Sequence, residues 1–317
     1  MHQQLDLRVD QAAPGALWRV SNHPVDVYLN RLGSGSRRGQ SQALDTMARL
    51  FSNGCRDSKS LDWASLSYSQ TIALRRVLAE RYAPNTTKRM LAALRGILKE
   101  CWRLGLVSRE QYTRTADVGA VKGELPTRGR ALTGEELRCL FEVCEHDSSP
   151  AGVRDAAILG LLYGLGLRRS ELIGLNVEDH SPEGDKVFIR GKGQAIRFGY
   201  LTEETGGLLS RWLRLRGLIP GPMFLPLTKS GHLVPQRLTT ESIAQILKKR
   251  AAQAAVRPFS CHDLRRSFIT HLLEAGVDIA LVQRIAGHRQ VSTTVLYDLR
   301  GEEAKVKAME LLRVPIG

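Results

Sequence analysis

The sequence predicts a mainly α-helical protein with one small antiparallel β-sheet, arranged as a helical domain followed by an α+β domain. Its 317 residues exceed what one hydrophobic core usually organises, so two domains are expected. Apolar residues recur at helical spacing through most of the chain, whereas residues 186–201 are rich in β-branched and aromatic residues around a Gly-Lys-Gly turn. Residues 119–130 are rich in Gly, Pro and charge, which is typical of a linker between domains.

The predicted first domain covers residues 22–118 and contains four or five helices, with breaks at residues 33–36, 53–54, 61–69 and 84–85. Residues 1–21 show little periodicity and are interpreted as an N-terminal arm. The clearest helix is expected to begin with Thr86 or Thr87 as its N-cap and to end near Gly105. Its predicted buried residues are Met90, Leu91, Leu94, Ile97, Leu98, Cys101 and Trp102.

Another face of this helix carries four cations, Lys88, Arg95, Lys99 and Arg103. A basic stripe on a helix is often just a solvated surface, but it also suits the phosphate backbone of a nucleic acid. These four residues are therefore candidate DNA-binding residues.

The predicted second domain covers residues 131–317. Thr133 is an N-cap followed by two acidic residues, and it predicts a helix there. Residues 153–163 form an apolar helical stretch, and residues 186–201 predict a β-hairpin. Helices resume at about residue 203 and continue to the end, except for an irregular Gly/Pro stretch at residues 217–226.

Composition favours a polyanionic partner. The chain has 46 Lys plus Arg against 32 Asp plus Glu, a formal charge of +14, which indicates nucleic acid or else ordinary solubility charge. Five cysteines without a CxxC pair suggest neither disulfides nor a zinc site and fit a reducing cytoplasm. No secretion signal or membrane span is recognisable. We expect a soluble, cytoplasmic protein with no membrane partner.

The candidate chemical groups are hydrogen-bond donors and cations ending in one tyrosine. They are Arg168, Lys192, His262, Arg265, His288 and Tyr297. Such donors suit a pocket that holds a phosphodiester and neutralises the charge of a transition state, which a tyrosine could attack. Each residue alone has an ordinary explanation, such as a turn lysine for Lys192 or a packed aromatic for Tyr297.

Two glycine motifs do not predict a nucleotide site. The Gly-x-Gly at residues 164–166 lacks a third glycine and follows a helix, and the Gly-Lys-Gly at residues 191–193 lacks the spacing of a P-loop. We therefore expect no cofactor and no metal.

In combination, these residues carry a resemblance. Gly-Leu-Arg-x-x-Glu, a hairpin Gly-Lys-Gly, His-x-x-Arg, Gly-His and a tyrosine occur in this order, and residues 260–299 (SCHDLRRSFITHLLEAGVDIALVQRIAGHRQVSTTVLYDL) are the closest stretch. Here the chain resembles the tyrosine recombinase (phage integrase) family, of the Xer and integrase type. The resemblance implies a helical, SAM-like core-binding domain at residues 22–118 and a tyrosine-recombinase catalytic domain at residues 131–317.

The resemblance also implies roles for the six candidates. Arg168 and Arg265 look like the pair that clamps the scissile phosphate. Lys192 resembles the general acid for the departing 5′ oxygen, and His262 the acid/base histidine. His288 is similar to the histidine that hydrogen-bonds the phosphate, and Tyr297 to the nucleophile that forms a 3′-phosphotyrosyl bond.

Three arginines lie at, or shortly after, positions where this sequence departs from the family's usual pattern. Arg197 keeps a basic position after a Gly-Lys-Gly that lacks its usual second lysine and proline. Arg266 replaces a common histidine, and Arg289 a small polar residue. All three are expected to add positive charge near DNA.

The implied function is a site-specific DNA recombinase, bacterial or phage-encoded and acting near the nucleoid. It would form a homo-tetramer on two double-stranded DNA sites by exchanging a C-terminal helix at residues 302–312. A type IB topoisomerase would share the chemistry but relax supercoiled DNA as a monomer. A DNA-binding architectural or regulatory protein that lost its chemistry would form no tyrosyl adduct.

Overall fold

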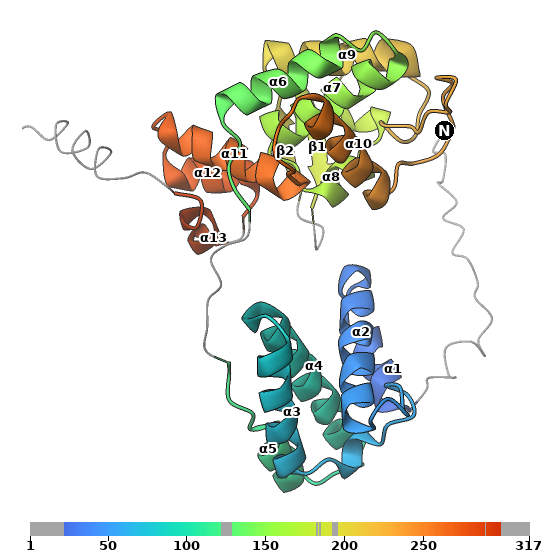
Figure 1. Cartoon of the computed structure of the whole chain (residues 1–317), viewed down its shortest axis with the longest axis vertical. Coiled ribbons are helices and arrows are strands. Elements are labelled where there is room, and N and C mark those ends of the chain that lie inside the picture. Colours follow the sequence, from blue (N-terminus) through green and yellow to red (C-terminus); the bar gives the residue numbers. More distant parts are fainter. Residues whose placement is uncertain are drawn as a thin grey trace, which may run out of the picture. The chain divides into compact units, whose positions relative to one another are not determined.

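The structure is a computed structural model that describes residues 22–121, 129–181, 183, 185–191, 196–288 and 290–298. Contacts divide the chain into two compact units, Met1–Thr127 and Arg128–Gly317. The described part is mainly helical with one two-stranded antiparallel sheet, which confirms the predicted fold class (Figure 1). The predicted N-terminal arm and C-terminal helix lie outside the described residues.

The first unit is built around one long helix. The described elements are α1 (Pro24–Asn30), α2 (Ser34–Phe51), the 3-10 helix η1 (Trp63–Ser65), α3 (Tyr68–Arg81), α4 (Pro84–Arg103) and α5 (Arg109–Ala116). All the other elements of the unit contact α4, and the fully buried Leu94 and Ile97 lie on it. A Cβ at Gly96 would lie 2.2 Å from the Tyr28 ring, so glycine lets α1 approach α4 closely.

The start predicted for α4 is wrong. The helix begins at Pro84 with Ala83 as its N-cap, because a proline at the first helical position has a suitable φ and lacks only an N–H that would have no helical partner. Thr87 lies inside the helix, and its hydroxyl donates to the carbonyl of Leu78 at 3.0 Å. The predicted end is confirmed, since α4 stops at Arg103 and Gly105 adopts a φ of +72°.

The predicted linker is partly packed against the units on either side. Arg75 Nε donates to the carbonyl of Gly119 at 2.8 Å in the first unit. The backbone N–H of Arg130 donates to Asp263 Oδ1 at 3.0 Å in the second. Residues 122–128 lie outside the described residues.

The second unit is mixed. Its described elements are α6 (Gly134–Glu145), α7 (Pro150–Gly164), α8 (Arg169–Gly174), the 3-10 helix η2 (Val177–Asp179), β1 (Lys186–Arg190), β2 (Ile196–Tyr200), α9 (Glu203–Arg216), α10 (Thr240–Gln253), α11 (Cys261–Glu274), α12 (Ile279–Ala286) and α13 (Val291–Val295). The Thr133 cap of α6 is confirmed, with Glu136 completing a capping box. The irregular stretch is longer than predicted and ends only where Thr239 caps α10.

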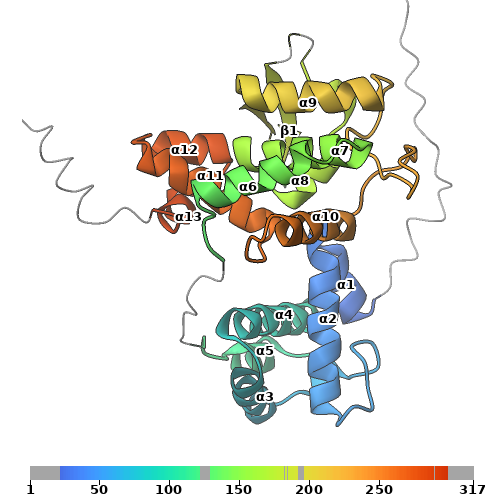
Figure 2. The ribbon, with the colours of Figure 1, turned by 45° about the horizontal axis from the view of Figure 1, so that its top comes forward.

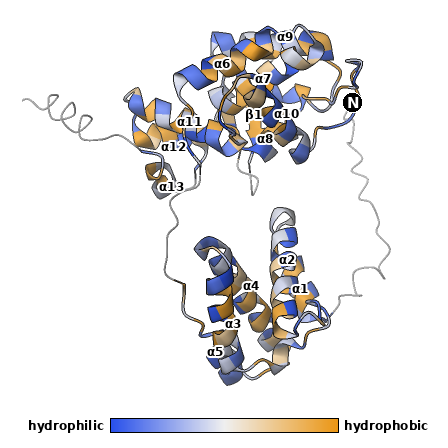
Figure 3. Cartoon of the chain, viewed as in Figure 1, coloured by the Kyte–Doolittle hydropathy of each residue, from blue (hydrophilic) through white to orange (hydrophobic). Residues whose placement is uncertain are grey.

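The core of the second unit surrounds α7. This helix contacts α6, α9 and α11, and Figure 1 and Figure 2 both show α9 lying beside it. Most helices carry both hydrophilic and hydrophobic stretches in Figure 3, as amphipathic helices do. Arg250, which is fully buried on α10, pairs with Asp155 of α7 at 2.8 Å, so an ion pair joins these helices inside the core.

Candidate active site

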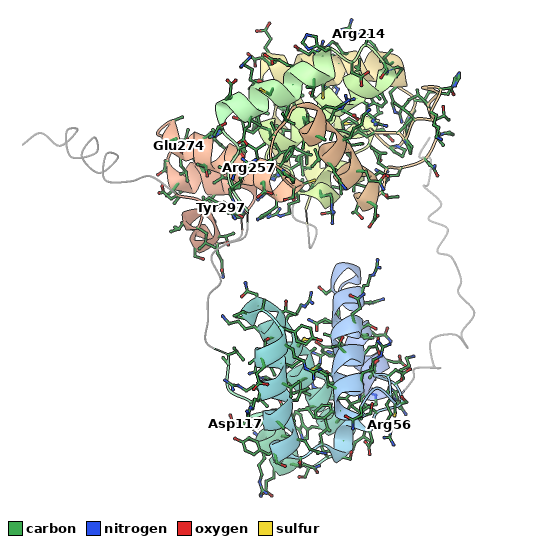
Figure 4. The ribbon with its side chains drawn as sticks, viewed as in Figure 1. Arg56, Asp117, Arg214, Arg257, Glu274 and Tyr297 are labelled. Atoms are coloured by element: carbon green, nitrogen blue, oxygen red, sulfur yellow. The ribbon has the colours of Figure 1, made fainter. Side chains whose placement is uncertain are left out.

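Helix ends gather the candidate catalytic residues in the second unit. Arg168 caps the start of α8, and His262 and Arg265 lie in the first turn and a half of α11. His288 follows α12, and Tyr297 follows α13. Figure 4 labels Tyr297 where α13 ends. Helices α11 and α12 contact each other, as do α12 and α13, so residues more than 120 positions apart in the chain meet in one place.

Tyr297 is held by its ring, its hydroxyl and its backbone. The side chain is buried, and its hydroxyl lies 3.0 Å from His262 Nε2. Its ring stacks on that of His288 with a centroid distance of 5.8 Å, and the guanidinium of Arg266 lies 5.1 Å from its centroid. Thr270 Oγ1 donates to the carbonyl of Tyr297 at 3.1 Å. The phenol oxygen therefore has a fixed position beside a base.

Arg265 is a buried guanidinium anchored by backbone carbonyls. Only 1% of the residue is exposed. Its Nη1 donates to the carbonyl of Gly166 at 2.5 Å, and its Nη2 donates to that of Ala286 at 2.7 Å. Ala286 is the last residue of α12, where the helix dipole favours a cation. This guanidinium is thus oriented before any ligand arrives.

Arg168 is anchored beside it and is more open to solvent. Its Nη1 donates to Glu171 Oε1 at 2.5 Å, and its Nη2 donates to the carbonyl of Gly287 at 3.2 Å. The two arginines therefore share the C-terminal end of α12, because Ala286 and Gly287 supply adjacent carbonyls. Gly287 adopts the left-handed conformation with a φ of +69°, which suits glycine at this helix end.

His288 is buried and uncharged at neutral pH. Its Nδ1 lies 2.8 Å from Thr294 Oγ1. Burial, followed by the charges of Arg265 and Arg168, lowers the pKa of His288 to about 4. Its neutral ring can therefore donate from one nitrogen and accept at the other.

The pKa of His262 and that of Arg265 are also lowered by burial and neighbouring cations. For His262 the cause is partial burial of the ring, then the charges of Arg266 and Arg265. For Arg265 burial and the charge of Arg168 lower the pKa to about 10, so it remains a cation at neutral pH. The site thus combines neutral imidazoles with charged guanidiniums, and His262 is suited to accept a proton from Tyr297.

A pocket of about 450 Å³ opens over this cluster. Arg168, His262 and Arg265 line it together with Arg169, Ser260 and Cys261. Burial raises the pKa of the Cys261 thiol to about 11, which keeps it protonated. Among the described residues, no group of three or more His, Cys, Asp or Glu side chains could hold a metal ion.

Five of the six predicted catalytic residues come together in this way, and Lys192 lies outside the described residues. Arg289 lies outside them too. The predicted site residues did not include Glu171, although its carboxylate accepts from Arg168. A carboxylate three residues after the arginine was the available signal.

The other predicted DNA-binding residues fall into two groups. Lys88, Lys99 and Arg103 are exposed on α4, whereas Arg95 is half-buried and donates to the carbonyl of Val118. Two arginines of the second unit that are expected to add positive charge near DNA are largely buried. Arg266 is 6% exposed and lies over the Tyr297 ring. The Arg197 side chain is 14% exposed, and its Nη2 donates to Glu171 Oε2 at 3.0 Å.

Comparison with known proteins shows which class of protein carries this site. The protein is a tyrosine recombinase, an enzyme that acts on DNA. More particularly, the chain belongs to the phage integrase family, whose model matches residues 130–301, more than half of its length. No helix in the described ranges has the length and apolar character needed to cross a membrane.

Its relatives include named recombinases. The tyrosine recombinase XerD of Pseudomonas aeruginosa is 35% identical over 226 residues, which cover 69% of this chain and 72% of the relative. The tyrosine recombinase XerC of Roseiflexus castenholzii is 32% identical over 242 residues, 74% of each chain. Among solved structures, the XerH site-specific recombinase bound to its difH substrate before cleavage matches with a TM-score of 0.64 and 21% identity. This match covers 89% of this chain and 80% of XerH, and it shows the shared fold.

Proposed function

We propose that this recombinase cleaves and rejoins DNA strands at specific sites through a covalent 3′-phosphotyrosine at Tyr297. The observation that carries this proposal is the distance of 3.0 Å between the Tyr297 hydroxyl and His262 Nε2, next to two guanidiniums that backbone carbonyls hold in place. Double-stranded DNA is the proposed partner, which agrees with the +14 charge of the chain.

The chemical step uses these groups in named roles. The Tyr297 oxygen attacks the scissile phosphorus and gives its proton to His262, while the bond from phosphorus to the 5′ oxygen breaks. Arg168 and Arg265 neutralise the charge of the pentavalent transition state, and His288 hydrogen-bonds a phosphate oxygen. Lys192, by its resemblance to the family, protonates the departing 5′ oxygen. The tyrosyl phosphate conserves the energy of the broken bond, so a new 5′ hydroxyl can attack it and restore the strand.

We further propose that the enzyme works as a tetramer on two DNA sites, with residues 302–312 of one protomer docking on the next. These residues lie outside the described part of the chain. Their sequence supports the proposal, because Val306, Met309 and Leu312 recur at helical spacing in a segment too short to form a stable isolated helix.

A nicked suicide substrate tests the function. The substrate is a duplex built on inverted repeats to be sought in the DNA beside the gene, with a nick placed so that the short fragment bearing the released 5′ hydroxyl diffuses away. We expect the parent protein to form a DNA adduct that survives denaturation, and Tyr297→Phe to form none. Tyr200→Phe is the matched control, because Tyr200 is 65% exposed on β2, and it should form the adduct normally.

Two outcomes would contradict the proposal. An adduct formed by Tyr297→Phe would show that another residue is the nucleophile. Relaxation of supercoiled DNA of any sequence by the monomer would favour a type IB topoisomerase instead of a recombinase.

A further inference from the structure

Arg197 shares the carboxylate of Glu171 with Arg168 of the candidate site. It lies on β2, opposite Ile189 of β1, and its side chain is 14% exposed. Burial is the main cause of the lowered pKa of Arg265 and of His288, and the charge of Arg197 lowers both further, so it lies near both groups. A cation in such a place has either a structural or a catalytic use, and its contacts distinguish the two.

The first contact is with Glu171, whose carboxylate is 3% exposed. Arg197 Nη2 donates to Glu171 Oε2 at 3.0 Å. The same carboxylate accepts from Arg168 twice, from Nη1 at 2.5 Å and from the backbone N–H at 3.0 Å. Glu171 is therefore a buried carboxylate held between two guanidiniums. Arg197 helps to fix the position of this carboxylate, and the carboxylate in turn orients the Arg168 guanidinium.

The second contact is with the end of α12. A Cβ built on Gly287 would lie 2.8 Å from Arg197 Nε, so the Arg197 side chain packs directly against this backbone. The carbonyl of Gly287 is the other acceptor of Arg168, at 3.2 Å. Arg197 thus touches both groups that fix the Arg168 guanidinium.

Resting on the proposed function, we propose that Arg197 is a positioning residue for phosphate transfer. It fixes the Glu171 carboxylate and the Gly287 backbone, and through them it aims Arg168 at the scissile phosphate. Residues that orient the ligands of a metal typically change activity by about 10-fold to 100-fold when they are mutated, and we expect an effect of the same order here. Because the predicted role runs through Glu171, loss of Arg197 and loss of the Glu171 charge should have the same consequence.

The test measures the single-turnover rate of adduct formation on the nicked substrate for Arg197→Ala, Glu171→Gln and the double variant. We expect each single variant to be about 10-fold to 100-fold slower, and the double variant to be no slower than the slower single one, because both changes break one chain of contacts. DNA affinity, measured by fluorescence anisotropy on the same duplex, should stay within about twofold of the parent, because the Arg197 and Glu171 side chains are only 14% and 3% exposed and offer little surface to a DNA strand.

Two further variants make the result specific. Arg197→Lys keeps one donor for Glu171 and should recover part of the rate, which a merely space-filling role would not predict. Lys186→Ala removes a cation from the same hairpin whose partner is the exposed Asp185, and it should cleave at the parental rate. If Arg197→Ala does not fold, the cleavage rates of Arg197→Lys and Glu171→Gln are compared instead.

A parental rate for Arg197→Ala would overturn the inference, and so would multiplication of the two single effects in the double variant. In either case the parent still forms its Tyr297 adduct, so the proposed function stands. Absence of any adduct from the parent would instead contradict the proposed function.

Discussion

At the scale of single residues, the two arginines of the site differ in how deeply they are buried. Arg265 is fully buried and satisfies the carbonyls of Gly166 and Ala286. The Arg168 side chain is 39% exposed and pairs with Glu171. Arg265 thus also supports the fold, whereas Arg168 is more exposed to the pocket.

Replacing either arginine by alanine should abolish cleavage while DNA binding is largely kept. Loss of one oriented donor from a transition-state site typically costs about 100-fold to 1,000-fold in rate. Arg265→Ala should also lower the free energy of unfolding by about 1–3 kcal/mol, because it leaves buried carbonyls without donors, whereas Arg168→Ala should change it less. Adduct formation and urea unfolding measure the two effects, and normal cleavage by either variant would contradict the assignment.

His288 predicts a pH dependence of stability. Its pKa is about 4 in the folded protein and about 6.5 in an unfolded chain, so the unfolded state binds more protons between these values and stability falls as the pH decreases through this window. The loss should reach about 3 kcal/mol near pH 4. Urea unfolding of the parent and His288→Asn at pH 7, 5.5 and 4 measures it, since the variant lacks this group. A stability difference between the two proteins that does not change with pH would contradict the prediction.

At the scale of elements, the turn between α7 and α8 positions the pocket. Gly166 in this turn has a φ of +56°, and a Cβ there would lie 2.4 Å from Phe268 Cδ1 on α11. Its carbonyl is also the acceptor of Arg265 Nη1. Close approach of the turn to α11 and the orientation of Arg265 therefore depend on the same glycine.

Gly166→Ala should destabilise the protein by about 1–3 kcal/mol, from the left-handed backbone alone, and should slow cleavage by moving the Arg265 anchor. Gly207→Ala is the matched control. Gly207 lies inside α9 with no atom within 4 Å of a built Cβ, so alanine there should stabilise the helix by up to about 1 kcal/mol. Thermal unfolding and adduct formation measure both variants. Equal stability of the two variants would show that the turn is not constrained.

At the scale of the whole molecule, the two units have separate cores. One core gathers around α4, and the other around α7, with a smaller cluster that includes Tyr297. The proposed nucleophile thus belongs to the cluster formed by α11, α12 and the residues after α13. This cluster is the part of the second unit closest in sequence to the proposed exchange segment.

Removal of residues 302–317 should damage synapsis and recombination more than binding of a single site. The physical reason is that the proposed protomer contact lies in this segment, whereas the groups that we assign to one DNA site precede it. Gel-shift titration on one site and on paired sites, together with a recombination assay, separates the two effects. Recombination at the parental level by the shortened protein would contradict the proposed exchange.

Much of this protein could be predicted from patterns within short stretches of sequence. Apolar spacing located the helices, the Thr133 capping box located the start of α6, and the Gly-Lys-Gly turn located the hairpin. Errors occurred where local signals competed, as at Pro84, which begins α4 although it was interpreted as a break. Order and spacing of the site residues, compared with a known family, indicated the class of enzyme.

Contacts between distant residues required the tertiary structure. Nothing near Arg197 in the sequence shows that it meets Glu171, 26 positions earlier, or that Gly287 leaves space for it. Likewise, the sequence alone indicates only one more surface cation at Arg266, but α11 places its guanidinium over the Tyr297 ring. Local periodicity and caps depend on neighbours in the chain, which a sequence displays directly. Burial and pairing of charges depend on which helix ends meet, and folding of the whole second unit decides that.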